Sequence, residues 1–175
     1  LLIGRVDKDN FRKGHAEVIA AWHRVTKKIP EARLLLVGGG DGAGLLRKTV
    51  AESPAREQID VLGFVPEEDM PSLWSQAHAF VQPSWKEGFG LVYIEAMRYG
   101  LPVIASVHDA GQEVNVDRET GYNVDLTDPE ALAARIVELL SNRDQAITMG
   151  AAGQARWESQ FRYSAFTTRL MDILE

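Results

Sequence analysis

Residues 79–100 read AFVQPSWKEGFGLVYIEAMRYG and hold a complete transition from strand to helix. The apolar run Ala79–Val81 is short and is followed by Pro83, which is typical of a buried strand. From Gly90 to Tyr99 the sequence favours a helix, and Gly100 stands where that helix would end. Glycines and charged residues fill the loop between them. The segment predicts one strand–loop–helix unit of an α/β protein.

The same alternation runs through the first 124 residues. Predicted strands cover Leu1–Val6, Arg33–Val37, Ile59–Leu62, Ala79–Val81, Pro102–Ala105 and Gly121–Val124. Predicted helices cover His15–Ile29, Leu45–Ser53, Glu67–Gln76, Gly90–Tyr99 and a short stretch near Ala110–Val116. Regular alternation of this kind, with strands apolar on both sides, indicates a Rossmann-like, doubly wound parallel sheet of about six strands covered on both faces.

After residue 128 the sequence predicts only helices. Asp128 is a good N-cap and Pro129 suits a first helical position. Two more helices are expected over about Arg143–Gln160 and Tyr163–Glu175. Residues 1–175 therefore suit one domain with C-terminal helices.

Composition excludes several classes of protein. There is no cysteine among the 175 residues, so disulfides, Cys-ligated metals and Cys nucleophiles are excluded. The net charge of −6 argues against a nucleic-acid partner. No apolar run approaches the roughly 20 residues of a membrane span. We expect a cytoplasmic location, and peripheral attachment of the full-length protein to the inner face of a membrane stays open. Because Leu1 begins inside an apparent strand, we interpret it as a fragment boundary.

Ligands of doubly wound sheets bind outside the carboxyl ends of the strands, which draws attention to the loop 83–90. Gly88 and Gly90 let the backbone approach a ligand, and the following helix start offers unpaired N–H groups for a phosphate. Glu87 precedes the helix and Glu95 lies about a turn and a half into it. The spacing predicts a crevice in which amides hold phosphate between two carboxylates that bind sugar hydroxyls.

Glu87, seven intervening residues and Glu95 resemble the E-x7-E motif of retaining GT-B glycosyltransferases of the glycosyl transferases group 1 (GT4-like) family. The match includes the G-F-G filling at residues 88–90. Further segments resemble the family in the same order, and together they span nearly the whole chain: Gly4-Arg5, Lys13-Gly14, Gly63-Phe64-Val65, residues 100–105 (GLPVIA) and Glu119-Thr120-Gly121.

The resemblance implies a role for each matched position. Glu95 would bind the nucleotide ribose, and Glu87 the donor sugar. Arg5 and Lys13 would neutralise the diphosphate leaving group. Backbone groups of the glycine-rich turn would assist them: Gly88, Phe89, Gly90, Leu91 and Val92. Gly63, Phe64 and Val65 would lie along the base. We further expect Gly38 and Gly40 to form a loop over the crevice, and a contact of His108 with the donor sugar stays open, as does the role of Gln112-Glu113.

The resemblance also implies a hexosyltransferase that retains anomeric configuration, with a UDP-sugar or GDP-sugar as donor. This chain would be the donor-binding C-terminal half of a GT-B fold, and the acceptor would bind an N-terminal domain absent here. The chain alone would bind nucleotide with little or no transfer. We expect no metal or other cofactor, because Arg5 and Lys13 supply the cations, and Asp7-Lys8-Asp9 is interpreted as a solvated turn.

Two alternatives remain. Residues 38–43 (GGGDGA) fit the dinucleotide fingerprint G-x-G-x-x-A, and Asp60 follows about twenty residues later, which would suit an NAD(P)-dependent oxidoreductase. Asp60, however, begins its predicted strand, whereas the ribose-binding acid should end one. The other alternative is a noncatalytic sugar-nucleotide-binding module on the same fold.

Overall fold

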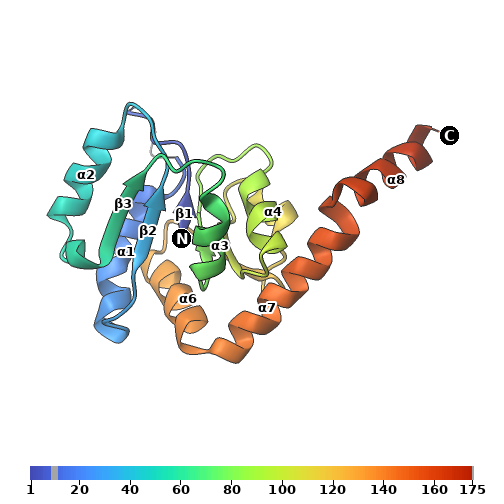
Figure 1. Ribbon diagram of the computed structural model, residues 1–175. Coiled ribbons are helices and arrows are strands. Elements are labelled where there is room, and N and C mark those ends of the chain that lie inside the picture. Colours follow the sequence, from blue (N-terminus) through green and yellow to red (C-terminus); the bar gives the residue numbers. More distant parts are fainter. Residues whose placement is uncertain (9–11, 175) are drawn as a thin grey trace.

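The computed structural model describes residues 1–8 and 12–174 (Figure 1). Its strands are β1 (Leu2–Ile3), β2 (Leu34–Val37), β3 (Ile59–Gly63), β4 (Phe80–Val81), β5 (Val103–Ser106) and β6 (Gly121–Val124). Its α-helices are α1 (His15–Lys28), α2 (Ala43–Glu52), α3 (Met70–Gln76), α4 (Leu91–Arg98), α5 (Gly111–Val114), α6 (Pro129–Ser141), α7 (Arg143–Arg156) and α8 (Tyr163–Leu174). A 3-10 turn (Arg56–Gln58) precedes β3, and a π-helical turn (Trp157–Phe161) separates α7 from α8.

All strand pairs are parallel and form two ladders, β1-β2-β3 and β4-β5-β6. Leu1 joins the two ladders. Its amino group donates to the Ala79 carbonyl oxygen over 3.1 Å, and its carbonyl oxygen accepts from the Val81 amide over 2.9 Å. The spatial order is therefore β3-β2-β1-β4-β5-β6, with the winding direction reversing between β1 and β4. This confirms the predicted Rossmann-like α/β class and puts the ligand crevice beside the ends of β1 and β4.

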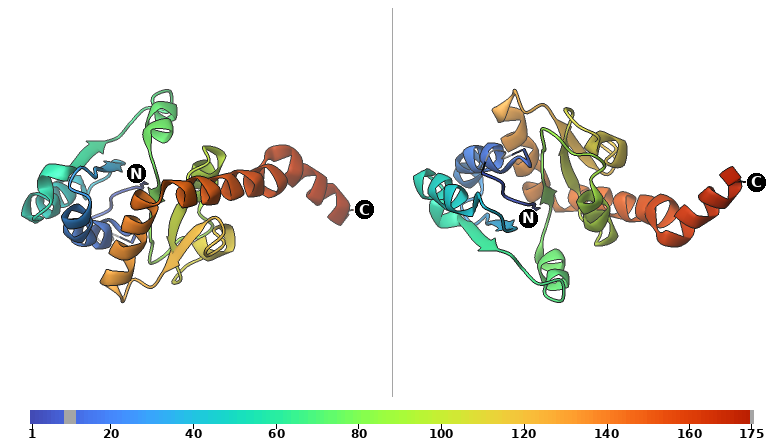
Figure 2. Two further views of the ribbon diagram at one scale, coloured as in Figure 1. Left: turned by 90° about the horizontal axis from the view of Figure 1, so that it is seen from below. Right: turned by 90° about the horizontal axis from the view of Figure 1, so that it is seen from above.

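Helices on opposite faces of the sheet build two cores. One core joins α1, α2 and α6 to the strands through side chains such as Trp22, Leu46 and Ile136. The other core joins α3, α4 and α5 through side chains such as Trp74 and Tyr93. Beyond the body, α7 leads into α8, which extends away from the sheet in all views (Figures 1 and 2).

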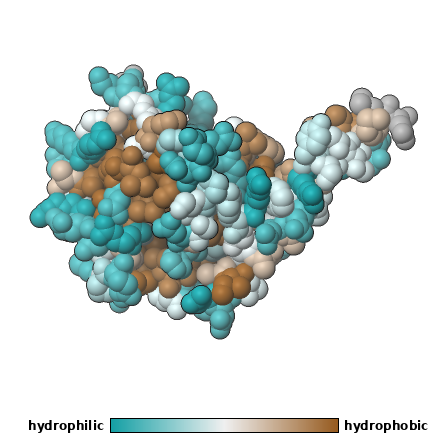
Figure 3. All heavy atoms as spheres, viewed as in Figure 1, coloured by the Kyte–Doolittle hydropathy of each residue, from teal (hydrophilic) through white to brown (hydrophobic). Residues whose placement is uncertain are grey.

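The sheet is less completely covered than the sequence predicts. Leu35 of β2 and Leu62 of β3 lie on the face opposite α1 and α2, and Leu62 is 42% exposed. Figure 3 shows an apolar area in the region that Figure 1 labels β2 and β3. The face of β2 and β3 opposite α1 and α2 is therefore only partly covered at the edge strand β3.

Among the boundaries that differ from the predicted ones, three have a larger shift. The first strand ends at Ile3, although the Val6 amide still donates to the Gly39 carbonyl oxygen over 3.1 Å. Helix α3 begins at Met70 and not at Glu67, because Pro71 fits the first turn of a helix but not its interior. The helix expected over residues 143–160 leaves α-helical geometry at Trp157.

The predicted cap at Asp128 is confirmed, because its carboxylate accepts from the amides of Glu130 (3.0 Å) and Ala131 (3.1 Å). Asp128→Ala should lower the free energy of unfolding by about 1 kcal/mol, since two amides at the start of α6 lose their acceptor. Urea denaturation measures this loss. Asp69→Ala is the matched control, because Asp69 precedes α3 without capping it. Equal losses in both variants would contradict the assignment.

Candidate functional site

The segment after β1 and the loop after β4 lie against each other. The Arg12 carbonyl oxygen accepts from the Trp85 amide and from the Ser84 hydroxyl, each over 2.7 Å. Gly14 has a φ of 81°, and a Cβ atom there would lie 2.3 Å from the Pro83 carbonyl oxygen. Only glycine permits this approach. The segment before α1 is thus fixed beside the carboxyl end of β4.

This approach brings Lys13 and Glu87 together. The Lys13 ammonium group donates to a Glu87 carboxylate oxygen in a direct ion pair. The two side chains are only 29% and 15% exposed, so solvent screens them less than it screens a surface pair. A partly desolvated cation just before α1 is suited to an anionic ligand.

The glycine-rich turn between Glu87 and α4 requires glycine at its last position. Gly90 precedes α4 with a φ of 89°, and a Cβ atom there would lie 2.3 Å from the Tyr93 ring. Tyr93 is fully buried, and its hydroxyl donates to the Gln82 carbonyl oxygen over 2.7 Å. Burial, then Asp109 and Glu87, raise the pKa of Tyr93, so the phenol stays neutral. Because Gly90 cannot cap the helix with a side chain, the first amides of α4 remain suited to an anion.

Glu95 lies further along α4, on the side of the β3–α3 loop. Partial burial raises the pKa of Glu95, the nearby Glu67 raises it further, and Arg98 opposes the shift. Glu67 belongs to the loop after β3, whereas the charges that neighbour Glu87 belong to the ends of β1 and β5. Glu87 and Glu95 therefore both lie at the carboxyl ends of the strands, but at different places, with the turn 88–91 between them. Glu95 itself remains accessible to solvent.

The loops after β2 and β3 lie side by side near Glu67. The Gly38 amide donates to the Gly63 carbonyl oxygen over 2.8 Å, and a Cβ atom on Gly39 would lie 3.6 Å from that of Phe64. Phe64 is 79% exposed and half-buried Val65 packs on the core of α3 and α4. A Cβ atom on Gly38 or Gly40 would collide with the Gly4 or Val6 carbonyl oxygen. Packing alone therefore requires glycine at positions 38 and 40.

The other residues of the segment 88–92 differ in how exposed they are. Gly88 and Leu91 are exposed, and half-buried Val92 packs on the core. Phe89 is partly exposed and meets Phe161 edge-on, with ring centroids 6.4 Å apart. The π-helical turn after α7 therefore supports the turn at the start of α4.

Arg5 lies in the loop after β1 and pairs with Asp7 over 2.6 Å. Its side chain is largely exposed, unlike that of Lys13. A Cβ atom on the adjacent Gly4 would lie 3.3 Å from the Lys13 Cβ, so this loop runs beside Lys13. The Lys8 amide donates to Asp41 over 2.9 Å, and Asp9 lies outside the described residues.

Asp109, the neighbour of His108, belongs to the same cluster of charged groups as Glu87 and Lys13. Its Oδ1 accepts from the Gly111 amide over 2.8 Å, whereas Oδ2 is buried and has no hydrogen-bond partner among the described residues. Ser84 lies near, but its hydroxyl donates to Arg12. Burial raises the pKa of Asp109, the Gly111 amide opposes the shift, and Glu87 adds to it. Its place after the strand that ends at Ser106 was the available signal.

His15 and His108 have different surroundings. Burial lowers the pKa of His15 to about 4, and Lys13 lowers it further, so the ring is neutral. His108 stacks on Trp85 with centroids 4.7 Å apart, and its Nε2 lies 2.9 Å from Asp125 Oδ1. The contact of His108 with a sugar stays a prediction.

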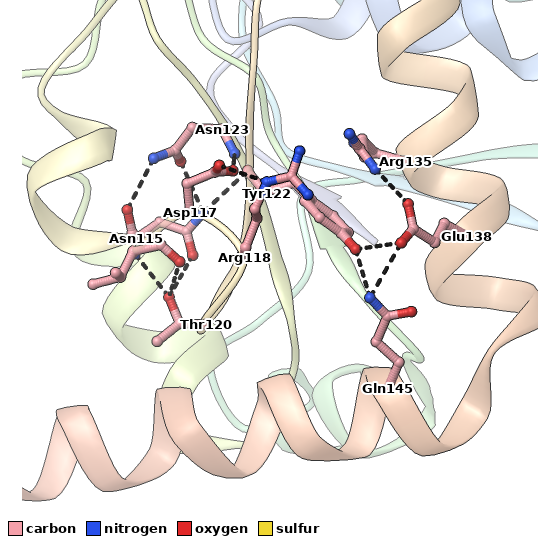
Figure 4. A network of polar contacts seen from close by, with 10 residues as sticks. Asn115, Asp117, Arg118, Thr120, Tyr122, Asn123, Arg135, Glu138 and Gln145 are labelled. Carbon is pink, nitrogen blue, oxygen red and sulfur yellow. Dashed lines mark hydrogen bonds and ion pairs between the residues drawn. The ribbon is translucent and has the colours of Figure 1, made fainter.

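A buried polar network supports the loop after β5 (Figure 4). The Asn115 side chain donates to the carbonyl oxygens of Val103 (3.3 Å) and Tyr122 (3.1 Å) and accepts from Thr120 (2.7 Å). Further along, the Tyr122 hydroxyl donates to Glu138 over 2.6 Å. The network ties α5 to β5 and β6, and β6 to α6. It thereby fixes the base of the turn that carries Asp109.

The fingerprint alternative lacks its acidic residue. Asp60 forms hydrogen bonds of 2.6–3.1 Å with Arg33, which precedes β2. Asp60 is thus at the amino end of the strands, away from the loops described above. This placement argues against an NAD(P) site at residues 38–43.

The sheet order, the glycine-rich turn and the carboxylates on both sides of it define a Rossmann-type domain with its candidate site at the switch point. The chain belongs to the family Glycosyl transferases group 1, whose sequence model matches residues 1–156. It corresponds to the C-terminal domain of a GT-B fold, as predicted.

Curated relatives are longer than this chain. The chain is 31% identical over 170 residues to the GDP-mannose-dependent alpha-(1-6)-phosphatidylinositol monomannoside mannosyltransferase of Mycobacterium tuberculosis, which covers 93% of this chain and 44% of that protein. It is 34% identical over 181 aligned residues to the D-inositol 3-phosphate glycosyltransferase of Corynebacterium kroppenstedtii, covering 99% and 39%. The chain therefore spans less than half the length of these relatives.

Two solved structures show the same fold. Sucrose-phosphate synthase from Thermosynechococcus elongatus superposes with a TM-score of 0.86 at 34% identity, covering 99% of this chain and 43% of that one. The C-terminal domain of a glycosyl transferase group 1 family protein from Francisella tularensis gives 0.79 at 27% identity, covering 93% and 86%. Within the described part of this chain, no helix is long and apolar enough to cross a membrane.

Asp109→Asn should stabilise the chain at neutral pH. The folded pKa of Asp109 lies above its ordinary value, so its favourable contribution is complete below the ordinary carboxyl range and is lost as the pH rises through the folded pKa. Asparagine keeps the acceptor for Gly111 and removes the charge. The advantage should appear near pH 7 and vanish near about pH 3, measured by thermal unfolding.

Asp117→Asn is the control, because Asp117 also accepts from a backbone amide, that of Asn123, but is exposed. Equal stability of the Asp109→Asn variant and the unaltered chain at both pH values would contradict a destabilising charge at Asp109.

Proposed function

We propose that this domain binds the nucleoside diphosphate sugar donor of a retaining glycosyltransferase. The observation that carries the proposal is the partly desolvated Lys13–Glu87 pair beside the open start of α4. A diphosphate needs cations and aligned N–H groups, and a sugar needs acceptors for its hydroxyls. Membership of the glycosyl transferases group 1 family supports this reading.

Each matched residue then has one role. The Lys13 ammonium group and the amides at residues 89–92 hold the diphosphate, and they stabilise the negative charge that grows as the glycosidic bond to phosphate breaks. Arg5 supplies a second cation from the adjacent loop. Glu87 binds donor-sugar hydroxyls. A hydroxyl that donates to Glu87 replaces part of its contact with Lys13, which leaves the ammonium group free for phosphate.

The nucleoside would occupy the other side of the turn. Glu95 binds the ribose hydroxyls, and the exposed Phe64 ring, between Gly63 and Val65, offers a surface on which the base stacks. Gly38 and Gly40 line the same side. His108 lies in the loop after β5, on the side of the turn that carries Glu87 and not on the side that carries Glu95.

The acceptor would bind a second domain. The matched relatives are more than twice as long as this chain, which supports a partner domain outside residues 1–175. Their names give GDP-mannose as a donor in one case and inositol phosphate compounds as acceptors, and we extend to this chain only the donor class, a UDP-hexose or GDP-hexose. A cytoplasmic location belongs to the same proposal. The 175-residue chain should bind donor and transfer little or no sugar.

The test of the function is a calorimetric titration of the 175-residue chain with UDP-glucose, GDP-mannose and NAD. One of the two sugar nucleotides should bind, because the site provides partners for diphosphate and for hexose hydroxyls. NAD should bind more weakly than that donor, since Asp60 is remote. Binding of NAD in preference to both sugar nucleotides would reject the proposal.

Glu87 and Glu95 should differ in what they recognise. Glu95→Ala should weaken the sugar nucleotide and the free nucleoside diphosphate alike, by about 1–3 kcal/mol, because both carry the ribose. Glu87→Ala should weaken the sugar nucleotide more than the free diphosphate. Glu52→Ala, an exposed position on α2, is the control. Equal losses of both ligands in Glu87→Ala would contradict the role given to that carboxylate.

A further inference from the structure

Trp85 stands where three loops and helix α1 meet, beside the site but outside the roles given above. Its amide donates to the Arg12 carbonyl oxygen over 2.7 Å. Its indole N–H donates to a carboxylate oxygen of Glu17 on α1. Its ring stacks on His108 with the planes inclined by 27°. One side chain thus connects the loop after β4 with α1 and with the loop after β5.

His108 is itself fixed by its neighbours. Its Nε2 lies 2.9 Å from Asp125 Oδ1 and 3.2 Å from the Leu126 amide nitrogen. Its own amide donates to the Ser106 hydroxyl over 2.9 Å. The imidazole is therefore held against the β6–α6 loop, and one face of its ring stacks on Trp85.

Trp85 is held by specific contacts and not by burial. It is 40% exposed, whereas Trp22 and Trp74 are each 3% exposed within the two cores. A partly exposed aromatic ring gains less from the hydrophobic effect than a buried one, so its orientation depends on Glu17 and His108. Those two contacts fix the direction of the Trp85 side chain in the loop that leads to Glu87.

The contacts of Trp85 lie next to Lys13 and Glu87, the ion pair that the proposed function uses. Lys13 follows Arg12 directly, and Glu87 lies two residues after Trp85, so the Arg12–Trp85 hydrogen bond sits at the base of both side chains. We infer that Trp85, braced by Glu17 and His108, is a positioning residue that sets the placement of Glu87 relative to Lys13. It thereby determines how strongly a sugar nucleotide is preferred over a free nucleoside diphosphate. The inference rests on the proposed function, and it makes His108 a support for Trp85 and not a sugar contact.

The test compares dissociation constants of the 175-residue chain for UDP-glucose, GDP-mannose, UDP and GDP, together with thermal unfolding. Trp85→Ala should reduce the preference for the sugar nucleotide on the order of tenfold, because a misplaced carboxylate loses its hydroxyl partners. Trp85→Phe keeps the ring stack but loses the indole N–H, so its reduction should be smaller, about threefold. Trp22→Phe is the matched control, because it perturbs the core and should lower the melting temperature without changing the preference.

A double-mutant cycle separates support from direct contact. His108→Ala should reduce the preference in the unaltered chain and have little further effect in the Trp85→Ala background, since it acts through the ring. Additive effects would overturn the role given to His108. An unchanged preference in Trp85→Ala, or in Trp85→Phe should the alanine variant not fold, would overturn the inference while leaving the proposed function standing. Failure of the unaltered chain to bind either sugar nucleotide would reject the proposed function and the inference with it.

Discussion

The crevice depends on the hydrogen bonds at the Arg12 carbonyl oxygen, which accepts from the Trp85 amide and the Ser84 hydroxyl. They join the segment after β1 to the segment after β4, the two strands between which the sheet changes its winding direction. Gly14 permits the contact, because any side chain there would meet the Pro83 carbonyl oxygen. These bonds hold the two separate loops that carry Lys13 and Glu87 side by side.

Burial makes the charges of the crevice effective. The chain carries a net charge of −6, yet Lys13 lies with Glu87 and near Asp109 in a partly desolvated cluster. Two carboxylates lie close to one ammonium group, and the pKa of Asp109 is raised by burial in the first place and by the nearby Glu87 in addition. A ligand with hydroxyl donors would supply hydrogen bonds to the two carboxylates and so lower the cost of their burial, and its phosphate would pair with the ammonium group.

Long apolar patterns were the part of the fold that sequence predicted best. The helix over residues 15–28, the strand over 34–37 and the cap at Asp128 follow from local chemistry, and the structure has them. The start of α3 was wrong because proline tolerates the first turn of a helix and ends what precedes it. The uncovered area near Leu62 could not be read from alternation, because apolar strands look alike whether or not a helix packs on them.

The order of loops and the residue types at strand ends were determined by sequence alone: which segments reach the carboxyl edge, and that Glu87 and Glu95 border a helix start. Tertiary structure decided which side chains meet. The pairing of Lys13 with Glu87, the approach of Asp109 to Glu87 and the stacking of Trp85 on His108 each join residues that belong to different loops. Contacts between such distant positions depend on the packing of strands β1, β4 and β5, and no local pattern encodes the distances that result.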